Sequence, residues 1–134
     1  MTAGAQVVTD DVRRLVRAEV GGTAGFADLS HRFYLQVAAD GLLTELYPDI
    51  ARAERILALY LDEFWLGPPG YTSERGHPRM PMRHMPFLIG TAQARSWLRA
   101  MNTAIDQQSL GAEVSGELKR WFAGLARHIV EALE

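Results

Sequence analysis

Apolar side chains recur every three or four residues along almost the whole chain, and this spacing limits the fold more than any other feature. The β-branched residues are scattered, and no segment alternates apolar and polar residues for long. A spacing near 3.6 residues buries one face of a helix, whereas a half-buried strand needs a spacing of two. The length of 134 residues suits one compact core. We therefore expect an all-α fold in a single domain spanning residues 1–134.

Residues that start and stop helices divide the chain into five longer helices and one short helical turn. Ser, Thr, Asp and Asn favour helix starts because their side chains accept hydrogen bonds from the free amides of the first turn. Glycine and proline favour the ends. The long helices are expected over about 9–20, from 23 to a break at 40–41, from 49 or 50 through 64, over 91–107 and over 113–133. A short helical turn is expected to end near 46. The expected caps are Thr9 or Asp10, Thr23, Asp49 and Thr91.

Two of these helices have clear faces. Their core stripes are expected to be Ile50, Ala53, Leu57, Leu61 and Phe64 in the third long helix, and Trp97, Met101 and Ile105 in the fourth. In the third helix, Arg52, Glu54, Arg55 and Asp62 are expected to stay in water.

The segment from Gly67 to Pro86 differs from the rest of the chain. It holds five of the six prolines and three glycines, so most of it cannot be regular helix. A loop of this length is usually functional or disordered. Taken alone, an exposed rigid loop with solvated arginines is the better interpretation. A zinc site at His77 and His84 is weaker, because no third ligand lies nearby in sequence. A nucleic-acid patch built on the loop arginines is weak as well.

Composition removes several classes of function. The absence of cysteine excludes disulfides, thiolate nucleophiles, iron–sulfur clusters and cysteine-based zinc sites. A formal net charge of −2 gives no overall attraction to nucleic acid or to an anionic membrane. No apolar run approaches the roughly 18 residues that span a bilayer, and no signal peptide opens the chain, so a cytoplasmic location is expected.

Four stretches, taken in order and spacing, resemble the group II truncated hemoglobins. They are RFYLQVAADGLLTELYP, the pair FW at 64–65, YTSERGHPRMPMRHMPF and the later Trp97. RGHPR followed by MRH, with a tryptophan thirteen residues after His84, is far more particular than a lone histidine. The resemblance covers about Val20 to Ile105. Residues 1–8 extend beyond what the family needs, which leaves their disorder open.

The resemblance implies a shortened globin fold, with two antiparallel helix pairs packed two-over-two around a heme b (iron protoporphyrin IX) and with the proximal helix mostly replaced by loop. His84 would then be the proximal ligand of the iron. Tyr34, Tyr47 and Trp97 would surround the bound gas. Ala53 stands where many animal globins place a distal histidine. The resemblance therefore implies a pocket without a distal histidine.

The resemblance also assigns the rest of the cofactor site. Leu57 lies one turn after Ala53 and would face the gas. The wall and the partners of the heme propionates are expected among Phe33, Met80, Phe87, Tyr71, Arg75, Arg79 and Arg83, the arginines because guanidinium matches carboxylate geometry. Pro81 and Tyr60 depart from the family pattern. Tyr60 either adds a hydroxyl near the distal pocket or points its ring inward.

Three classes of function remain open. The first is a protein that binds dioxygen and other diatomic gases and retains them through hydrogen bonds from tyrosine and tryptophan, since bound dioxygen gains negative charge. The second is an oxidative heme enzyme of peroxidase or nitric-oxide dioxygenase type, which would use the same pocket and a reductase that the sequence does not name. The third is a helical interaction module without cofactor. A homodimer also stays open.

Overall fold

The computed structural model describes residues 8–76 and 90–133, and of residues 128–133 only the backbone. Within those ranges all regular structure is helical, as the sequence predicted. The helices are α1 (Asp10–Val20), α2 (Gly22–Ala38), α3 (Gly41–Thr44), α4 (Ile50–Phe64), α5 (Gly70–Arg75), α7 (Thr91–Gln107) and α8 (Ala112–Leu133).

Two of the four predicted helix caps, Thr9 and Asp49, are confirmed by the hydrogen bonds that their side chains accept. The Thr9 hydroxyl accepts from the Val12 amide at 3.2 Å, and the Asp49 carboxylate accepts from the Arg52 amide at 3.1 Å. The four-residue helix α3 begins after Asp40, whose carboxylate accepts from the amide two residues on at 2.9 Å. These starts were predictable because a cap acts within its own turn of chain.

Two predicted caps are wrong. Gly21, at φ 104°, ends α1 and directly precedes α2, so Thr23 lies inside the second helix rather than before it. Glycine readily adopts this left-handed backbone conformation. Because Gly21 both ends α1 and precedes α2, no further residue between the two helices is left to act as a cap. Thr91 is the first residue of α7, and the Gly90 amide ahead of it donates to the side-chain carbonyl of Gln93 at 3.2 Å.

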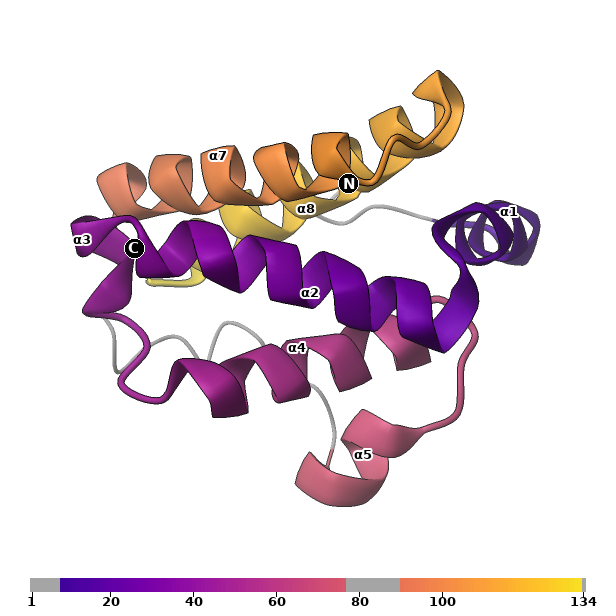
Figure 1. Cartoon of the computed structure of the whole chain (residues 1–134), viewed down its shortest axis with the longest axis horizontal. Helices are drawn as coiled ribbons and strands as arrows, with labels where there is room; N and C mark the ends of the chain where they lie inside the picture. The colour runs from indigo at the N-terminus through magenta and orange to yellow at the C-terminus, as the bar shows by residue number, and fades with distance from the viewer. Residues whose placement is uncertain (1–7, 77–89, 134) are drawn as a thin grey trace.

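The longer helices form two antiparallel pairs stacked on each other, the two-over-two arrangement that the resemblance implied (Figure 1). Helix α2 packs on α4, helix α7 packs on α8, and α2 also contacts α7. The predicted face of α7 is buried as expected, with Met101 and Ile105 fully buried and Trp97 6% exposed. One core therefore runs between the two layers.

Asp62 contradicts the expectation that it stays in water. Its side chain is buried and pairs with the guanidinium of Arg17 at 2.7 Å. Thr23 also donates to its carboxylate, at 3.0 and 3.1 Å to the two oxygens. The reason is that α1 and the start of α2 cover the last turn of α4. They bury the carboxylate of Asp62 and at the same time supply Arg17 and Thr23 as its hydrogen-bond partners, because an unpaired buried charge would be strongly destabilising.

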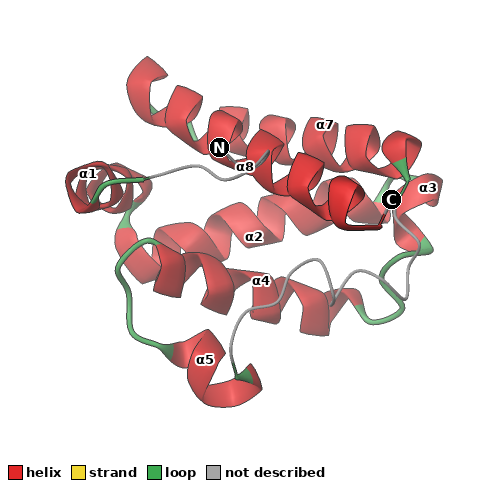
Figure 2. Ribbon diagram, turned by 180° about the vertical axis from the view of Figure 1, so that it is seen from behind, coloured by secondary structure: helices red, strands yellow, loops and turns green. Residues whose placement is uncertain are grey.

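The proline-rich segment contains one helix that the sequence did not predict, α5, which lies beside α4 on the side away from α7 and α8 (Figure 2). His84, expected as the iron ligand, and the expected pocket residues Arg83, Arg79, Met80 and Phe87 lie outside the described residues, as do His77, Pro81 and the segment 1–7. No helix in the described ranges is long and apolar enough to cross a membrane.

Candidate functional site

A cavity of about 280 Å³ lies among α2, the segment after α3, α4, α5 and α7. Its lining is mostly apolar and aromatic, with a few polar groups, which is the usual character of a ligand pocket. The lining residues are Tyr34, Leu46, Tyr47, Pro48, Asp49, Arg52, Ala53, Ile56, Leu57, Tyr60, Tyr71, Arg75 and Trp97. The cavity thus joins residues from five separate segments of the chain.

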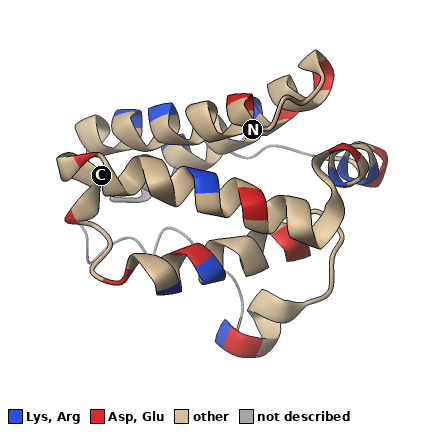
Figure 3. Cartoon of the chain, viewed as in Figure 1, with Lys and Arg blue, Asp and Glu red and all other residues tan. Residues whose placement is uncertain are grey.

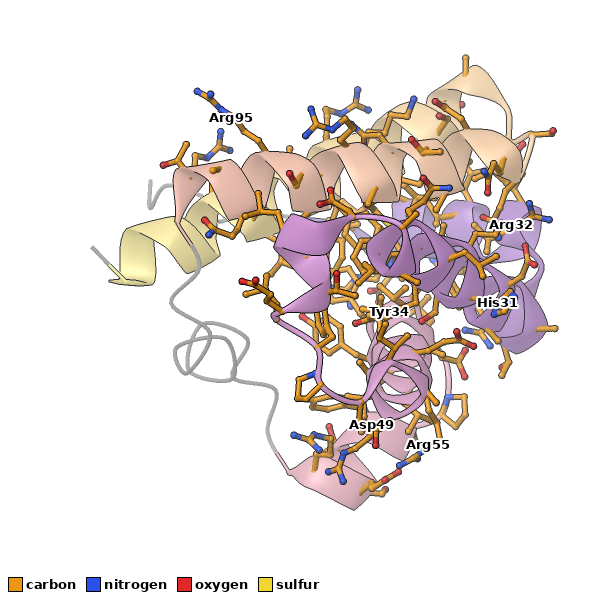
Figure 4. All side chains as sticks on the ribbon, turned by 60° about the vertical axis from the view of Figure 1, so that its left-hand side comes forward. His31, Arg32, Tyr34, Asp49, Arg55 and Arg95 are labelled. Atoms are coloured by element: carbon orange, nitrogen blue, oxygen red, sulfur yellow. The ribbon has the colours of Figure 1, made fainter. Side chains whose placement is uncertain are left out.

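The structure brings together the three residues expected around a bound gas. The indole nitrogen of Trp97 donates to the phenol oxygen of Tyr47 at 3.1 Å. The rings of Tyr34 and Tyr47 meet edge to face, with centroids 5.2 Å apart. Tyr34 comes from α2 and points toward the interior, whereas His31 and Arg32 of the same helix point outward (Figure 4). Trp97 and both tyrosines therefore form one connected polar cluster in the cavity lining.

Burial keeps both phenols of this cluster neutral. Tyr34 is only 5% exposed, and burial together with the adjacent Tyr47 raises its pKa well above the usual 10.0. Burial also raises the pKa of Tyr47, although the hydrogen bond from Trp97 opposes that rise. The neutral form of a phenol carries the proton that it can donate. At pH 7 both tyrosines therefore remain hydrogen-bond donors.

Phe33 supports the polar cluster from behind. It is fully buried and contacts Tyr34 and Trp97 edge to face, with ring centroids 4.8 and 5.3 Å away. It does not line the cavity, so the structure places it one layer deeper than the wall position expected from the sequence. The ring of Phe122 in α8 also contacts the indole, with its centroid 5.8 Å from that of Trp97. Trp97 thus packs against two phenylalanine rings.

One face of α4 forms another part of the lining. Leu57 is buried and Ala53 is half-buried, so the position where a distal histidine was considered carries only a methyl group. Tyr60 lines the cavity with its ring packed on Tyr71, the centroids 5.3 Å apart. Burial raises the pKa of Tyr60 to about 12. Tyr71 is 1% exposed, so its ring is a wall of the cavity.

The sequence did not predict that two charged residues line the cavity, namely Arg52 in the first turn of α4 and the cap residue Asp49. Arg52 and Asp49 line the cavity although both are exposed, and Arg75 of α5 lines it while half-buried. The signal was present, because the cavity-lining positions 49, 52, 53, 56, 57 and 60 recur at helical spacing. Arg52 was not assigned to the cavity-facing side of α4 because only apolar residues were assigned to that side.

The charged residues are otherwise spread over the molecule. In the view of Figure 3, acidic and basic residues alternate along the visible side of α4, and both signs are visible on α1, α2 and α5. His31 is exposed and contacts Glu54 at 3.2 Å. Within the described ranges no group of three His, Asp or Glu residues is placed to hold a metal ion. A metal in this part of the molecule would therefore need a ligand from elsewhere in the chain or from a cofactor.

The cavity suits a mostly apolar group that carries carboxylates. Leu57, Ile56 and the ring of Tyr71 offer apolar contact, and the guanidinium groups of Arg52 and Arg75 offer partners for carboxylates. This combination fits the heme that the resemblance implied. The described residues supply the pocket and the polar cluster.

Comparison with known proteins supports the same assignment. A family model described as bacterial-like globin matches residues 17–131. The chain is 35% identical over 117 residues to a group 2 truncated hemoglobin of Bacillus subtilis (strain 168), which covers 87% of this chain and 89% of that protein. It superposes on a thermostable hemoglobin of Thermobifida fusca with a TM-score of 0.82 at 39% identity, covering 86% of this chain and 95% of that one. For a truncated oxygen-avid haemoglobin of Bacillus subtilis the TM-score is 0.80 at 34% identity, with 86% and 98% covered.

Proposed function

Because this chain belongs to the bacterial-like globin family, and within it to the group II truncated hemoglobins, we propose that it binds heme b and retains dioxygen or another diatomic gas through its distal tyrosines. The observation that carries the proposal is the connected cluster of Tyr34, Tyr47 and Trp97 in the lining of a mostly apolar cavity. An apolar pocket with a few oriented donors suits a small ligand that gains negative charge when bound.

Each part of the cavity has a separate task toward the cofactor. When bound, heme supplies an iron atom that takes a diatomic gas on the face opposite an imidazole. His84 is the residue that we assign as that imidazole, from the resemblance. Leu57 and Ile56 would contact the macrocycle, while Arg52 and Arg75 would pair with its carboxylates.

The polar cluster would retain the gas by hydrogen bonding. Trp97 has a single N–H group and gives it to Tyr47, so its task is to fix the phenol of Tyr47. The neutral phenol of Tyr47 would donate to the gas, and the phenol of Tyr34 would do so after turning from the Tyr47 oxygen to which it is hydrogen-bonded. At about 1 kcal/mol per ordinary bond, and more toward a charged acceptor, two donors supply roughly 2–4 kcal/mol. That slows escape by roughly thirty- to a thousandfold, since each 1.4 kcal/mol is a factor of ten.

An absorption spectrum of the purified protein tests the proposal directly. We expect an intense heme band that shifts on reduction and again on addition of carbon monoxide. His84→Gly should lose the native axial bond, and added imidazole should restore it. His31→Gly is the matched control, because His31 is exposed on α2 and pairs only with Glu54 among the described contacts. A colourless wild-type protein, or an unaltered axial bond in His84→Gly, contradicts the proposal.

An oxidative role of the same pocket is the second candidate, and the direct hydrogen bond from Trp97 to Tyr47 favours it. Hydrogen-bond donors that are held in fixed positions beside a small ligand can stabilise negative charge on a departing oxygen atom. Such retention would also suit the redox chemistry of oxygen, nitric oxide or peroxide better than oxygen delivery. Steady-state peroxide turnover with a reducing dye, compared between wild type and Tyr34→Phe, tests this role. Equal turnover in both proteins contradicts it.

A further inference from the structure

Helix α5 is too short to be stable on its own. It has six residues, Gly70–Arg75, whereas isolated helices shorter than about twelve residues are marginal in water. Among the described helices it packs chiefly on α4. Yet α5 places Tyr71 and Arg75 in the lining of the cavity. The position of this part of the pocket therefore depends on how α4 holds α5.

Three residues of α4, spaced four apart, make the contacts that hold α5. Residues spaced four apart lie on one face of a helix, so Arg55, Leu59 and Glu63 form a single stripe, which we call the docking stripe. The Arg55 guanidinium makes two hydrogen bonds to the carboxylate of Glu74, at 2.8 and 2.6 Å. Figure 4 shows Arg55 on the side of α4 next to α5.

The middle of the docking stripe is a close apolar contact. A Cβ atom built at Gly70 would lie 3.0 Å from a terminal carbon of Leu59. This separation is tighter than ordinary van der Waals contact, so the end of the Leu59 side chain would have to shift by a few tenths of an ångström to admit a side chain at position 70. Glycine at the first residue of α5 therefore permits the close approach.

The end of the docking stripe supplies a cap that α5 lacks. The residue before α5 is Pro69, which has no side chain to accept a hydrogen bond from the free amides of the first turn. The Glu63 carboxylate does this instead, accepting from the Thr72 amide at 2.9 Å and from the Thr72 hydroxyl. A residue of α4 thus caps the neighbouring helix.

We propose that Arg55, Leu59 and Glu63 are positioning residues that fix α5 as a wall of the cofactor pocket and so determine how long the heme stays bound. None of the three side chains lines the cavity, so the effect acts through Tyr71 and Arg75. The inference rests on the proposed function, because it assigns heme to this cavity. It adds that release of the cofactor is controlled from the outer surface of α4.

Charge exchange tests the ion pair of the stripe. Both Arg55 and Glu74 are exposed, with side chains 54% and 42% accessible, so salt should weaken their attraction. In the heme-loaded protein we expect Glu74→Arg to speed heme transfer to a colourless acceptor globin by about two- to fivefold, because exposed pairs are individually weak. Amide hydrogen exchange over residues 70–76 should rise in the same variant. The double variant Arg55→Glu with Glu74→Arg should restore both rates, and high salt should reduce the differences.

The cap of the stripe is tested in the same two measurements. Glu63→Ala removes the acceptor and should raise both rates, whereas Glu63→Gln keeps a side-chain oxygen and should stay close to wild type. The control is Asp106→Asn, which breaks the comparably exposed pair between Lys119 of α8 and Asp106 of α7 and should change neither rate.

Two results would overturn the proposal. One is that Glu74→Arg and Glu63→Ala leave both rates unchanged, and the other is that the double charge exchange fails to restore them. A wild-type protein without the heme band contradicts the proposed function and with it the effect on retention. In that case the exchange of residues 70–76 still reports whether the stripe holds α5, so the two failures are distinguishable.

Discussion

The indole N–H of Trp97 donates to the phenol oxygen of Tyr47 at 3.1 Å, although the two residues are 50 positions apart in the chain. Trp97 has no second proton on its ring nitrogen. While this bond exists, the indole cannot also donate to a gas in the cavity. The pair therefore divides the task, with Trp97 orienting a phenol and Tyr47 offering its hydroxyl group to the pocket.

This division predicts that the effects of Trp97 and Tyr47 on gas retention are not additive. We expect Tyr47→Phe to speed dioxygen dissociation by roughly tenfold, which corresponds to about 1.4 kcal/mol for one good hydrogen bond to a charged acceptor. Trp97→Phe should have a smaller effect, because it only releases the phenol. Stopped-flow dissociation of the double variant should match Tyr47→Phe alone. If the two effects simply add, Trp97 acts on the gas directly.

Tyr60 predicts a loss of stability at alkaline pH. Its pKa is raised from 10.0 to about 12 in the folded protein, mainly by burial. In the unfolded chain the phenol loses its proton near pH 10, so between pH 10 and 12 the unfolded state binds fewer protons and the free energy of unfolding falls as pH rises. Below pH 10 the contribution is fully present.

Urea unfolding of wild type and Tyr60→Phe over pH 9 to 11.5 measures this effect. The wild type should lose up to about 1.4 kcal/mol per pH unit more than the variant above pH 10, the value for one proton. Tyr34 and Tyr47 remain in both proteins, so their contributions cancel in the comparison. Parallel curves across the whole range would mean that Tyr60 titrates alike in the folded and unfolded states.

The sequence predicted the helices well because their signals are local. Thr9, Asp40 and Asp49 each stand within a few residues of the amides they cap, and the apolar spacing of α7 is visible in its own seventeen residues. Helix α5 was missed for the opposite reason. Its cap, Glu63, lies on the preceding helix, and no rule of local spacing indicates that contact.

The candidate site was predictable mainly through family resemblance. At helical spacings, Tyr34 and Trp97 alone would have been interpreted as ordinary core residues. The resemblance placed them with Tyr47 around one ligand, and the structure brings all three together. Arg52 was missed because a charged residue in the first turn of a helix usually lies in water, and its place in the cavity lining depends on segments distant in the sequence, such as α2 and α5.

The charge of Asp62 is buried, although the sequence predicted that it stays in water. We therefore expect that truncation of this side chain strongly lowers the free energy of unfolding. Asp62→Ala should lower the free energy of unfolding by about 3 kcal/mol, because it leaves Arg17 largely buried without its carboxylate. Asp28→Ala is the control, since Asp28 forms an exposed pair with Arg32 and its loss should cost less than about 1 kcal/mol. Urea unfolding at neutral pH compares the two. Equal losses would show that burial adds nothing to the Arg17–Asp62 pair.

The last prediction concerns the corner between α1 and α2, which brings Arg17 to Asp62. A Cβ atom at Gly25 would overlap the carbonyl oxygen of Val20, a backbone atom that cannot move without displacing the end of α1. Gly25→Ala should therefore cost about 3 kcal/mol or more, as expected when a tight contact is overfilled. Gly41→Ala is the matched control, because its Cβ would meet nothing within 4 Å and alanine favours helix, so its stability should stay within about 1 kcal/mol of wild type or rise. If Gly25→Ala unfolds at the same urea concentration as Gly41→Ala, the end of α1 accommodates the added methyl group without loss of stability, which contradicts the prediction.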